Sequence, residues 1–141
     1  MNRLQNKVAI VTGANSGIGL RTAQLFAEEG AILVLCARRK EKLDEVAEAL
    51  RAQGSQVLSI AADVSREEDC VRVVEEAVKA FGRVDVLVNN AGMADKHRPI
   101  TRCDGDWWHT VIDVNQNSVY YMMKAALKYM ELAGYGSIVK I

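Results

Sequence analysis

Short apolar runs alternate with longer amphipathic stretches along the whole chain. The apolar runs, which are rich in β-branched residues, lie at residues 8–11, 32–36, 57–61, 84–88 and 137–141. The stretches between them place apolar residues at the i, i+3, i+4, i+7 spacing of one buried helix face, as Leu43, Val46, Ala47 and Leu50 do. The pattern therefore predicts strands that alternate with helices.

Polar and glycine signals predict where these helices begin and end. Glycine in the left-handed conformation commonly follows the end of a helix, and the predicted helices are followed by Gly30, Gly54, Gly82 and Gly134. Ser65 and Glu68 have the spacing of a capping box, with Ser65 as the N-cap of the third helix. The longest predicted helix covers residues 104–132.

Strands that are apolar on both faces are typical of a parallel sheet with helices on both sides. Right-handed crossovers between such strands give a doubly wound α/β sheet. A helical bundle with apolar linkers would not explain β-branched runs between glycine stops. No linker or low-complexity stretch divides residues 1–141, so the sequence predicts one domain.

Composition excludes several classes of function. The 18 Lys and Arg residues balance 18 Asp and Glu residues without a basic block, which argues against nucleic-acid binding. No apolar run approaches the ~18 residues of a membrane span, and no signal peptide is recognisable, so we expect a cytoplasmic protein. The three cysteines form no paired motif and predict reduced thiols. His97 and His109 lack metal-ligand spacing, so no metal site is expected.

The turn between the first predicted strand and helix contains three glycines, at Gly13, Gly17 and Gly19. Gly13 allows a tight turn, Gly17 lets a phosphate approach the backbone, and Gly19 lets the helix pack closely on the strand. The helix N-terminus offers free N–H groups to a pyrophosphate. The alternative is a flexible loop without a ligand.

The spacing G-x-x-x-G-x-G resembles that of the short-chain dehydrogenase/reductase family. Three further motifs follow in the family's order: Asp63-Val64 after the third strand, Asn89-Asn90-Ala91-Gly92 after the fourth, and Asn115 within the last predicted helix. The resemblance covers essentially the whole chain. It implies a Rossmann-like sheet of order 3-2-1-4-5, a homo-oligomer, and hydride transfer between a nicotinamide dinucleotide and a small carbonyl or alcohol substrate.

The resemblance also implies roles for individual residues. Asn115 belongs to the catalytic site, where it would hold a water of the proton relay, although an asparagine at this point in a helix also fits a kink or a solvated position. Asp63 would meet the adenine or only form a turn, and Asn90 would lie beside the ribose or only end a strand. The predicted cofactor-binding residues are Gly13, Asn15, Ser16, Gly17, Ile18, Gly19, Arg38, Asp63, Val64, Asn90, Ala91 and Gly92.

The end of the second strand bears on the choice of cofactor. An acidic residue at this position would bond the ribose 2′-hydroxyl of NAD, but the chain has Ala37, Arg38 and Arg39 there. A guanidinium matches a 2′-phosphate in charge and geometry, so we expect NADP with Arg38 as its ligand. Two observations keep NAD open: charged runs are usually solvated, and NADP-binding relatives often have a basic residue where Ser16 stands.

The family's catalytic Ser and Tyr-x-x-x-Lys follow the fifth strand, so we expect them beyond Ile141. Residues 1–141 are then the N-terminal part of an oxidoreductase, inactive alone, with an unpaired apolar edge strand that favours self-association. Tyr120 and Lys124 have the same spacing but precede the fifth strand, where an interface role fits better. The alternatives are a nucleotide-binding module without catalysis and a structural fragment that docks on another chain.

Overall fold

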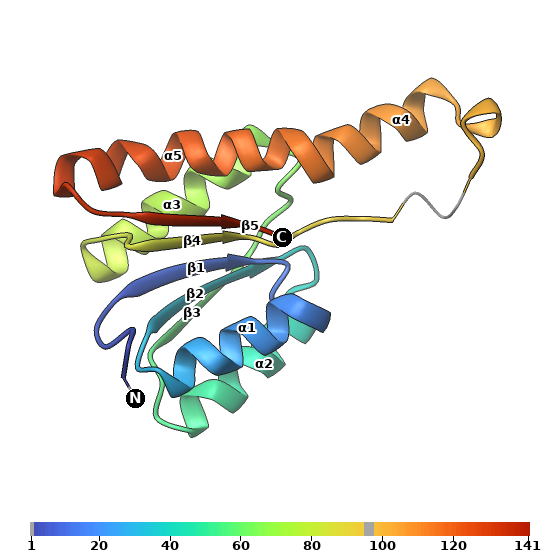
Figure 1. Cartoon of the computed structure of the whole chain (residues 1–141). Helices are drawn as coiled ribbons and strands as arrows, with labels where there is room; N and C mark the ends of the chain where they lie inside the picture. Colours follow the sequence, from blue (N-terminus) through green and yellow to red (C-terminus); the bar gives the residue numbers. More distant parts are fainter. Residues whose placement is uncertain (1, 95–97) are drawn as a thin grey trace.

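The computed structural model describes residues 2–94 and 98–141. Its centre is a five-stranded sheet of order β3-β2-β1-β4-β5, in which every pair of neighbours is parallel (Figure 1). This confirms the predicted doubly wound sheet and its strand order. The strands are β1 (Val8–Thr12), β2 (Ile32–Ala37), β3 (Val57–Ala61), β4 (Val86–Asn89) and β5 (Ser137–Lys140).

Helices cover both faces of the sheet and enclose two hydrophobic cores. α1 (Gly17–Glu28) and α2 (Lys40–Ala52) lie on one face, and α3 (Glu67–Phe81) and α5 (Ser118–Ala133) on the other (Figure 1). Side chains of a strand point alternately to opposite faces, so Ile10 packs towards α3 and α5 while Val11 packs towards α1 and α2. Both faces of β1 are therefore buried, as the apolar runs predicted.

The glycines that follow the helices adopt the predicted left-handed conformation. Their φ angles are +86° at Gly30, +96° at Gly54, +76° at Gly82 and +68° at Gly134. These positions end α1, α2, α3 and α5 and turn the chain back towards the next strand. The prediction of helix ends from glycine is confirmed.

The predicted capping box at the start of α3 is wrong. The helix begins at Glu67, with Arg66 at the N-cap position, and Ser65 does not cap it. The hydroxyl and the backbone N–H of Ser65 instead donate to Oδ1 of Asp63, at 2.7 and 3.0 Å. The Asp63 carboxylate thus accepts both donors of Ser65 in a local turn, which places Ser65 one residue before the N-cap position.

The long helix predicted over residues 104–132 is present, but it is not one regular α-helix. It consists of α4 (Gly105–Ile112), a π-helical segment η2 (Asp113–Asn117) and α5, and it is preceded by a 3-10 turn η1 (Ile100–Arg102). α4 extends beyond the sheet and buries none of its residues (Figure 1). No helix within the described ranges has the length and apolar character needed to cross a membrane.

A buried carboxylate joins the amino ends of β1 and β4. Asp85, only 2% exposed, accepts hydrogen bonds from the backbone N–H of Val8 at 2.9 Å and from two nitrogens of Arg83 at 2.7 and 2.8 Å. Burial favours the neutral carboxyl, but the bonds from Arg83 and Val8 outweigh it, and the pKa of Asp85 is lowered. These hydrogen bonds, called the Asp85 lock, hold β1 and β4 in register.

Candidate functional site

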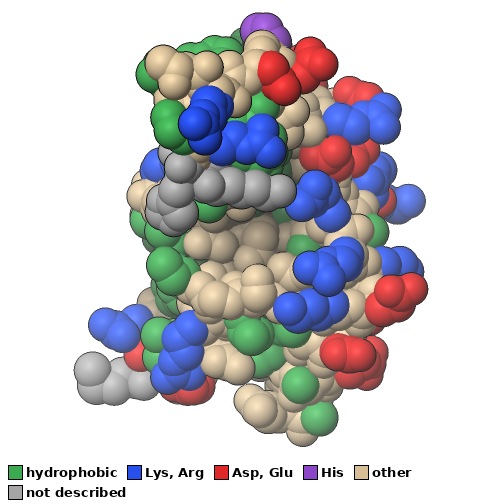
Figure 2. Space-filling model, turned by 90° about the vertical axis from the view of Figure 1, so that its right-hand side faces the viewer, with side chains coloured by type: hydrophobic (Ala, Val, Ile, Leu, Met, Phe, Trp, Pro, Cys, Tyr) green, Lys and Arg blue, Asp and Glu red, His purple; other side chains and the backbone are tan. Residues whose placement is uncertain are grey.

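A cavity of about 710 Å³ opens at the carboxyl ends of the parallel strands. This is where ligands bind in open α/β sheets, beside the point where the strand order reverses. In the space-filling view this face is hollowed near its centre, with Lys and Arg side chains along one side of the hollow (Figure 2). All the residues predicted to bind the cofactor line this cavity except Gly19, so the fold brings together segments that are far apart in sequence.

The glycine-rich turn forms one wall and leads into α1. Ser16 is the N-cap residue of α1, but its side chain makes no cap bond, and the first turn contains no acidic residue. The first N–H groups of the helix therefore keep their capacity for an anion, which the helix dipole also favours. Gly17 has φ +55°, and a Cβ there would meet no protein atom within 4 Å. The loop can thus receive a phosphate at its backbone.

Gly19 has a different place from the one predicted. A Cβ at Gly19 would overlap the carbonyl oxygen of Gly13 and the side-chain nitrogen of Asn90, and would lie 2.9 Å from the carbonyl carbon of Gly13. The close approach is therefore between α1 and the turn, rather than between α1 and the strand. Gly19 is buried behind the loop and does not line the cavity.

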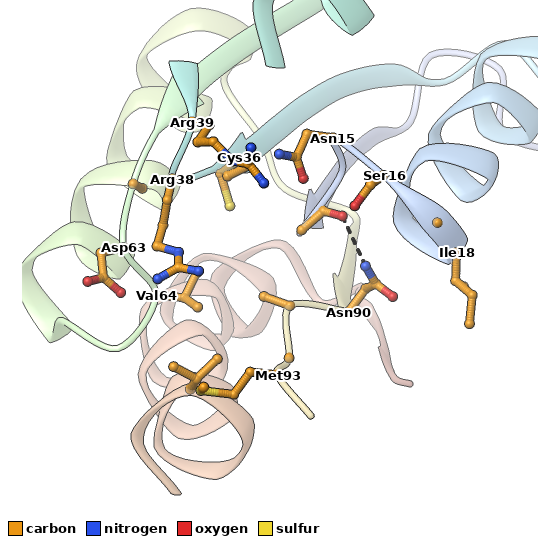
Figure 3. A pocket seen from close by; sticks show the side chains of 17 residues that line it. Asn15, Ser16, Ile18, Cys36, Arg38, Arg39, Asp63, Val64, Asn90 and Met93 are labelled. Atoms are coloured by element: carbon orange, nitrogen blue, oxygen red, sulfur yellow. Dashed lines mark hydrogen bonds between the residues drawn. The ribbon is translucent and has the colours of Figure 1, made fainter. Parts of the chain in front are cut away.

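Asn90 holds the end of β4 against this turn. Its side-chain N–H₂ donates to the carbonyl oxygen of Thr12 at 3.1 Å and to that of Gly13 at 3.2 Å, the bond drawn in Figure 3. In the other direction, Oγ1 of Thr12 accepts from the backbone N–H of Asn90 at 3.0 Å and of Ala91 at 2.9 Å. Sequence reasoning missed Thr12, although a hydroxyl at the end of a buried strand was a visible signal.

Arg38 and Arg39 follow β2 and lie at the mouth of the cavity, where both are exposed. The guanidinium of Arg38 points into the cavity near Val64 (Figure 3). Among the described residues, the ion pairs nearby join Lys40 to Asp44 and Arg66 to Glu68, and neither pair includes these two arginines. Two guanidinium groups therefore face the cavity without a carboxylate partner in the described structure.

Asn115 lines a second cavity of about 440 Å³, which shares Ile18 and residues 90–93 with the first. Its side-chain amide bonds the backbone of Met93 twice: Oδ1 accepts from the N–H at 2.7 Å, and Nδ2 donates to the carbonyl at 2.9 Å. These two bonds join the loop after β4 to the π-helical segment. Beside them, a Cβ at Gly92 would lie 3.2 Å from the same Oδ1.

The π-helical segment has its own side-chain support. The backbone N–H of Ser118 donates to the carbonyl of Asp113, five residues earlier, as a π-turn requires. The hydroxyl of Ser118 donates to the carbonyl of Val114 at 2.5 Å. The hydroxyl of this buried serine thus supplies a donor to the Val114 carbonyl, which the wider turn leaves without its usual N–H partner. Nothing in the sequence pattern indicated this irregularity except the asparagine itself.

Tyr120 and Lys124 lie on the exposed side of α5. Tyr120 is 58% exposed, and Nζ of Lys124 lies 3.4 Å from a carboxylate oxygen of Glu67 on α3. The bond to Glu67 raises the pKa of Lys124, to which Tyr120 also contributes. Neither residue lines the cavities at the carboxyl ends of the strands.

Cysteines and potential metal ligands add little to the site. Cys36 lines the larger cavity but is fully buried, and burial raises the pKa of its thiol to about 12. Within residues 2–94 and 98–141, no group of three or more His, Cys, Asp or Glu side chains could hold a metal ion. His97 lies outside the described residues.

The comparison with protein families decides the identity of this fold. A family model described as short chain dehydrogenase matches residues 7–141. The chain belongs to the short-chain dehydrogenase family. The predicted resemblance is thereby confirmed.

Similar proteins in this family include dehydrogenases from bacteria. Cis-4-hydroxycyclohexanecarboxylate dehydrogenase of Sinomonas cyclohexanicum is 42% identical over 96% of the chain and 54% of its own length. 7alpha-hydroxysteroid dehydrogenase of Clostridium sardiniense is 39% identical over 100% of the chain and 55% of its own length. The chain thus spans about half the length of the curated relatives it matches.

Solved short-chain dehydrogenases have the same arrangement of strands and helices. The crystal structure of a metagenomic short-chain oxidoreductase in complex with NADP superposes with a TM-score of 0.93 at 36% identity. The alignment covers 97% of this chain and 62% of that one. At this identity, the likeness supports the fold and the family together.

Proposed function

We propose that the larger cavity binds NADP, with the pyrophosphate at the glycine-rich turn and the amino end of α1. The supporting observation is the uncapped N-terminus of α1, which opens on the same cavity as two arginines without carboxylate partners. An anionic ligand with phosphates at two places satisfies both features. The residues present therefore fit this dinucleotide.

The preference for NADP over NAD rests on the end of β2. Arg38 takes the 2′-phosphate in this proposal, and Arg39 adds positive charge at the mouth of the cavity. Ala37, buried and without a polar side chain, offers no acceptor for a ribose 2′-hydroxyl. That one solved relative was crystallised with NADP is consistent with this choice.

The proposal extends to an oxidoreductase acting on a carbonyl or alcohol. When bound, the nicotinamide supplies or accepts a hydride. Residues of this chain hold the dinucleotide and shape the second cavity, where Asn115 fixes the loop at Met93 beside the nicotinamide end. The catalytic Ser and Tyr-x-x-x-Lys that the family resemblance implies would complete the proton transfer in the whole protein.

We also propose a cytoplasmic homo-oligomer. Tyr120 and Leu132 on α5 are both exposed. Exposed apolar residues of this kind are common where chains associate. Light scattering of the purified protein and cell fractionation test these two points.

Coenzyme titration tests the main proposal. The protein is titrated with NADPH and with NADH, and the coenzyme fluorescence and the melting temperature are followed. We expect saturable binding of NADPH at least about tenfold tighter than that of NADH, because one guanidinium–phosphate contact is lost with NADH. No response to either coenzyme would overturn the proposal. Residues 1–141 alone should bind the coenzyme without turnover under either hypothesis. Turnover of carbonyl compounds therefore has to be tested with the whole protein, where its absence would identify a nucleotide-binding module instead.

A further inference from the structure

We infer that Asp69 of α3, assisted by Cys70 and Arg72, positions the adenine-facing wall of the cavity and so sets the affinity for the adenosine half of the ligand. The wall is the segment of residues 61–64 between β3 and α3. The inference rests on the proposed function, since it concerns the nucleotide of that same cavity. It assigns α3 a role in binding although none of these three side chains lines the cavity.

Each of the three side chains bonds a different backbone group of the wall. Oδ2 of Asp69 accepts from the N–H of Asp63 at 2.8 Å. The thiol of Cys70 donates to the carbonyl of Val64 at 3.2 Å, and the Nη2 group of Arg72 donates to the carbonyl of Ala61 at 2.9 Å. The first two turns of α3 thus fix the chain at residues 61, 63 and 64.

Asp69 has the central position among these contacts. The N–H bond from Asp63 is the main cause of the lowered pKa of Asp69, and it outweighs the effect of burial. Arg72 lies 3.5 Å from the other carboxylate oxygen and joins Asp69 to the bond at Ala61. The carboxylate of Asp63 is held by Ser65, so it does not compete for this N–H.

The wall lies beside the arginines, because β3 and β2 are paired neighbours, and the close view shows the guanidinium of Arg38 next to Val64 (Figure 3). A base that enters between them contacts Ala62, Asp63 and Val64 from one side. Displacement of a binding wall by about 1 Å is enough to weaken a geometrically specific contact. Loss of the Asp69 carboxylate removes the hydrogen bond to the N–H of Asp63, so this part of the wall is no longer fixed to α3.

The test compares two nucleotides that differ only in the base. Binding of adenosine 2′,5′-bisphosphate and guanosine 2′,5′-bisphosphate is measured by calorimetry for the wild-type protein, Asp69→Ala, Asp69→Asn and a control, Glu75→Ala. Glu75 is an exposed acid further along the same helix. Asp69→Asn retains an oxygen that can accept from Asp63, so it serves as the conservative rescue.

We expect Asp69→Ala to lower the preference for the adenine nucleotide by about fivefold or more, because a hydrogen bond that shapes the wall is lost. Asp69→Asn should stay within about twofold of the wild type, and Glu75→Ala should not change the ratio. A general loss of stability would move the melting temperature without moving this ratio of affinities. Arg72→Met, which removes the bond to Ala61, provides a second variant and should change the ratio in the same direction.

The outcomes separate this inference from the proposed function. If the wild-type protein binds neither bisphosphate, the proposed function fails. If the wild type prefers the adenine nucleotide and Asp69→Ala and Arg72→Met keep the same ratio, the positioning role of α3 is wrong while the cavity remains a nucleotide site.

Discussion

The side-chain amide of Asn115 bonds both backbone groups of Met93: Oδ1 accepts from the N–H at 2.7 Å, and Nδ2 donates to the carbonyl oxygen at 2.9 Å. Both the oxygen and the nitrogen of the amide are thus hydrogen-bonded to the loop after β4. Its contribution to the site is to fix this loop, which lines both cavities. The sequence-based role, contact of the side chain with a relay water, remains a prediction.

Asn115→Asp provides a specific test of this pairing. The carboxylate still accepts from the N–H of Met93 but faces the carbonyl of Met93 with a second acceptor, which is unfavourable. We expect a loss of about 1–3 kcal/mol in the free energy of unfolding, measured with urea. Gln116→Glu, an exposed change in the same π-helical segment, is the control. Equal stability of Asn115→Asp and wild type would contradict the two-bond pairing.

The Asp85 lock predicts a pH dependence of stability. Burial raises the pKa of Asp85, but the hydrogen bonds from Arg83 and Val8 lower it by more, so the net pKa is lowered. The folded protein therefore favours the carboxylate more than the unfolded chain does. This stabilisation is complete above the unfolded pKa of about 3.9 and is lost as the pH falls through the lower folded value. Asp85→Asn should therefore cost about 1–3 kcal/mol at pH 7.

Urea unfolding of both proteins between pH 7 and pH 3 measures this difference. The gap between wild type and Asp85→Asn should narrow below about pH 4, because the stabilisation that the Asp85 carboxylate provides is lost there and is absent from the variant at every pH. Glu75→Gln, at an exposed site, should follow the wild type at every pH. A gap that stays constant down to pH 3 would contradict the role of the Asp85 charge.

Cofactor preference should change with substitutions at the end of β2. Arg38→Ala should weaken NADPH binding by about tenfold or more and leave NADH binding nearly unchanged, since NADH lacks the 2′-phosphate. Ala37→Asp should move the preference towards NADH by offering an acceptor to the ribose 2′-hydroxyl. Lys40→Ala is the control, because Lys40 pairs with Asp44. Fluorescence titration measures all of these, and equal losses for both coenzymes would argue against Arg38 as the phosphate ligand.

Two glycines of the same turn should respond differently to alanine. At Gly17 the methyl group meets no protein atom, so only the backbone strain of φ +55° is added, about 1–2 kcal/mol. The protein should remain folded and lose nucleotide binding, because the methyl lies where a phosphate approaches the backbone.

At Gly19 the methyl group overlaps the backbone of Gly13, so the turn itself has to move. We expect Gly19→Ala to reduce stability and nucleotide binding together, by about 1–3 kcal/mol in the unfolding free energy. Circular dichroism in urea and NADPH titration measure the two effects. Normal NADPH affinity in Gly17→Ala would show that the ligand does not approach the backbone at this point.

Thiol labelling should distinguish the three cysteines. Burial raises the pKa of both Cys36 and Cys70 to about 12, so both remain thiols at pH 8. Cys103 is partly exposed. A chromogenic disulfide reagent should therefore react rapidly with one thiol per chain, and with all three after unfolding in urea. Rapid labelling of a second thiol in the folded protein would contradict the packing around Cys36 and Cys70, and Cys103→Ser identifies the fast site.

The fold followed from the sequence because its signals are local. A glycine after α1, α2, α3 and α5 and an apolar run in each strand determine these elements, and the rules of crossover handedness then leave few arrangements. The cavity could be anticipated for the same reason, since carboxyl ends of parallel strands meet at one edge. Arg38 and Asp63 were placed together in this way.

The contacts within the site could not be predicted, because they join residues far apart in sequence. Oγ1 of Thr12 bonds Ala91, 79 positions later, and no periodicity indicates such a pair. At Ser65 a local rule failed because the Asp63 carboxylate accepts both donors of Ser65 in a turn, and the helix begins only after Arg66. In both cases the choice between competing partners depends on geometry that only the folded chain supplies.

The π-helical segment at Asp113–Asn117 also has a consequence for how this stretch can change in evolution. A π-turn holds one residue more than an α-turn. Deleting a single codon here would restore a regular helix. It would rotate α4 relative to α5 by about 100° around the helix axis. Trp107 and Trp108 would then point to a different side of the molecule, while α5 kept its buried face. A deletion of one residue could therefore change which surface α4 presents to a partner or ligand.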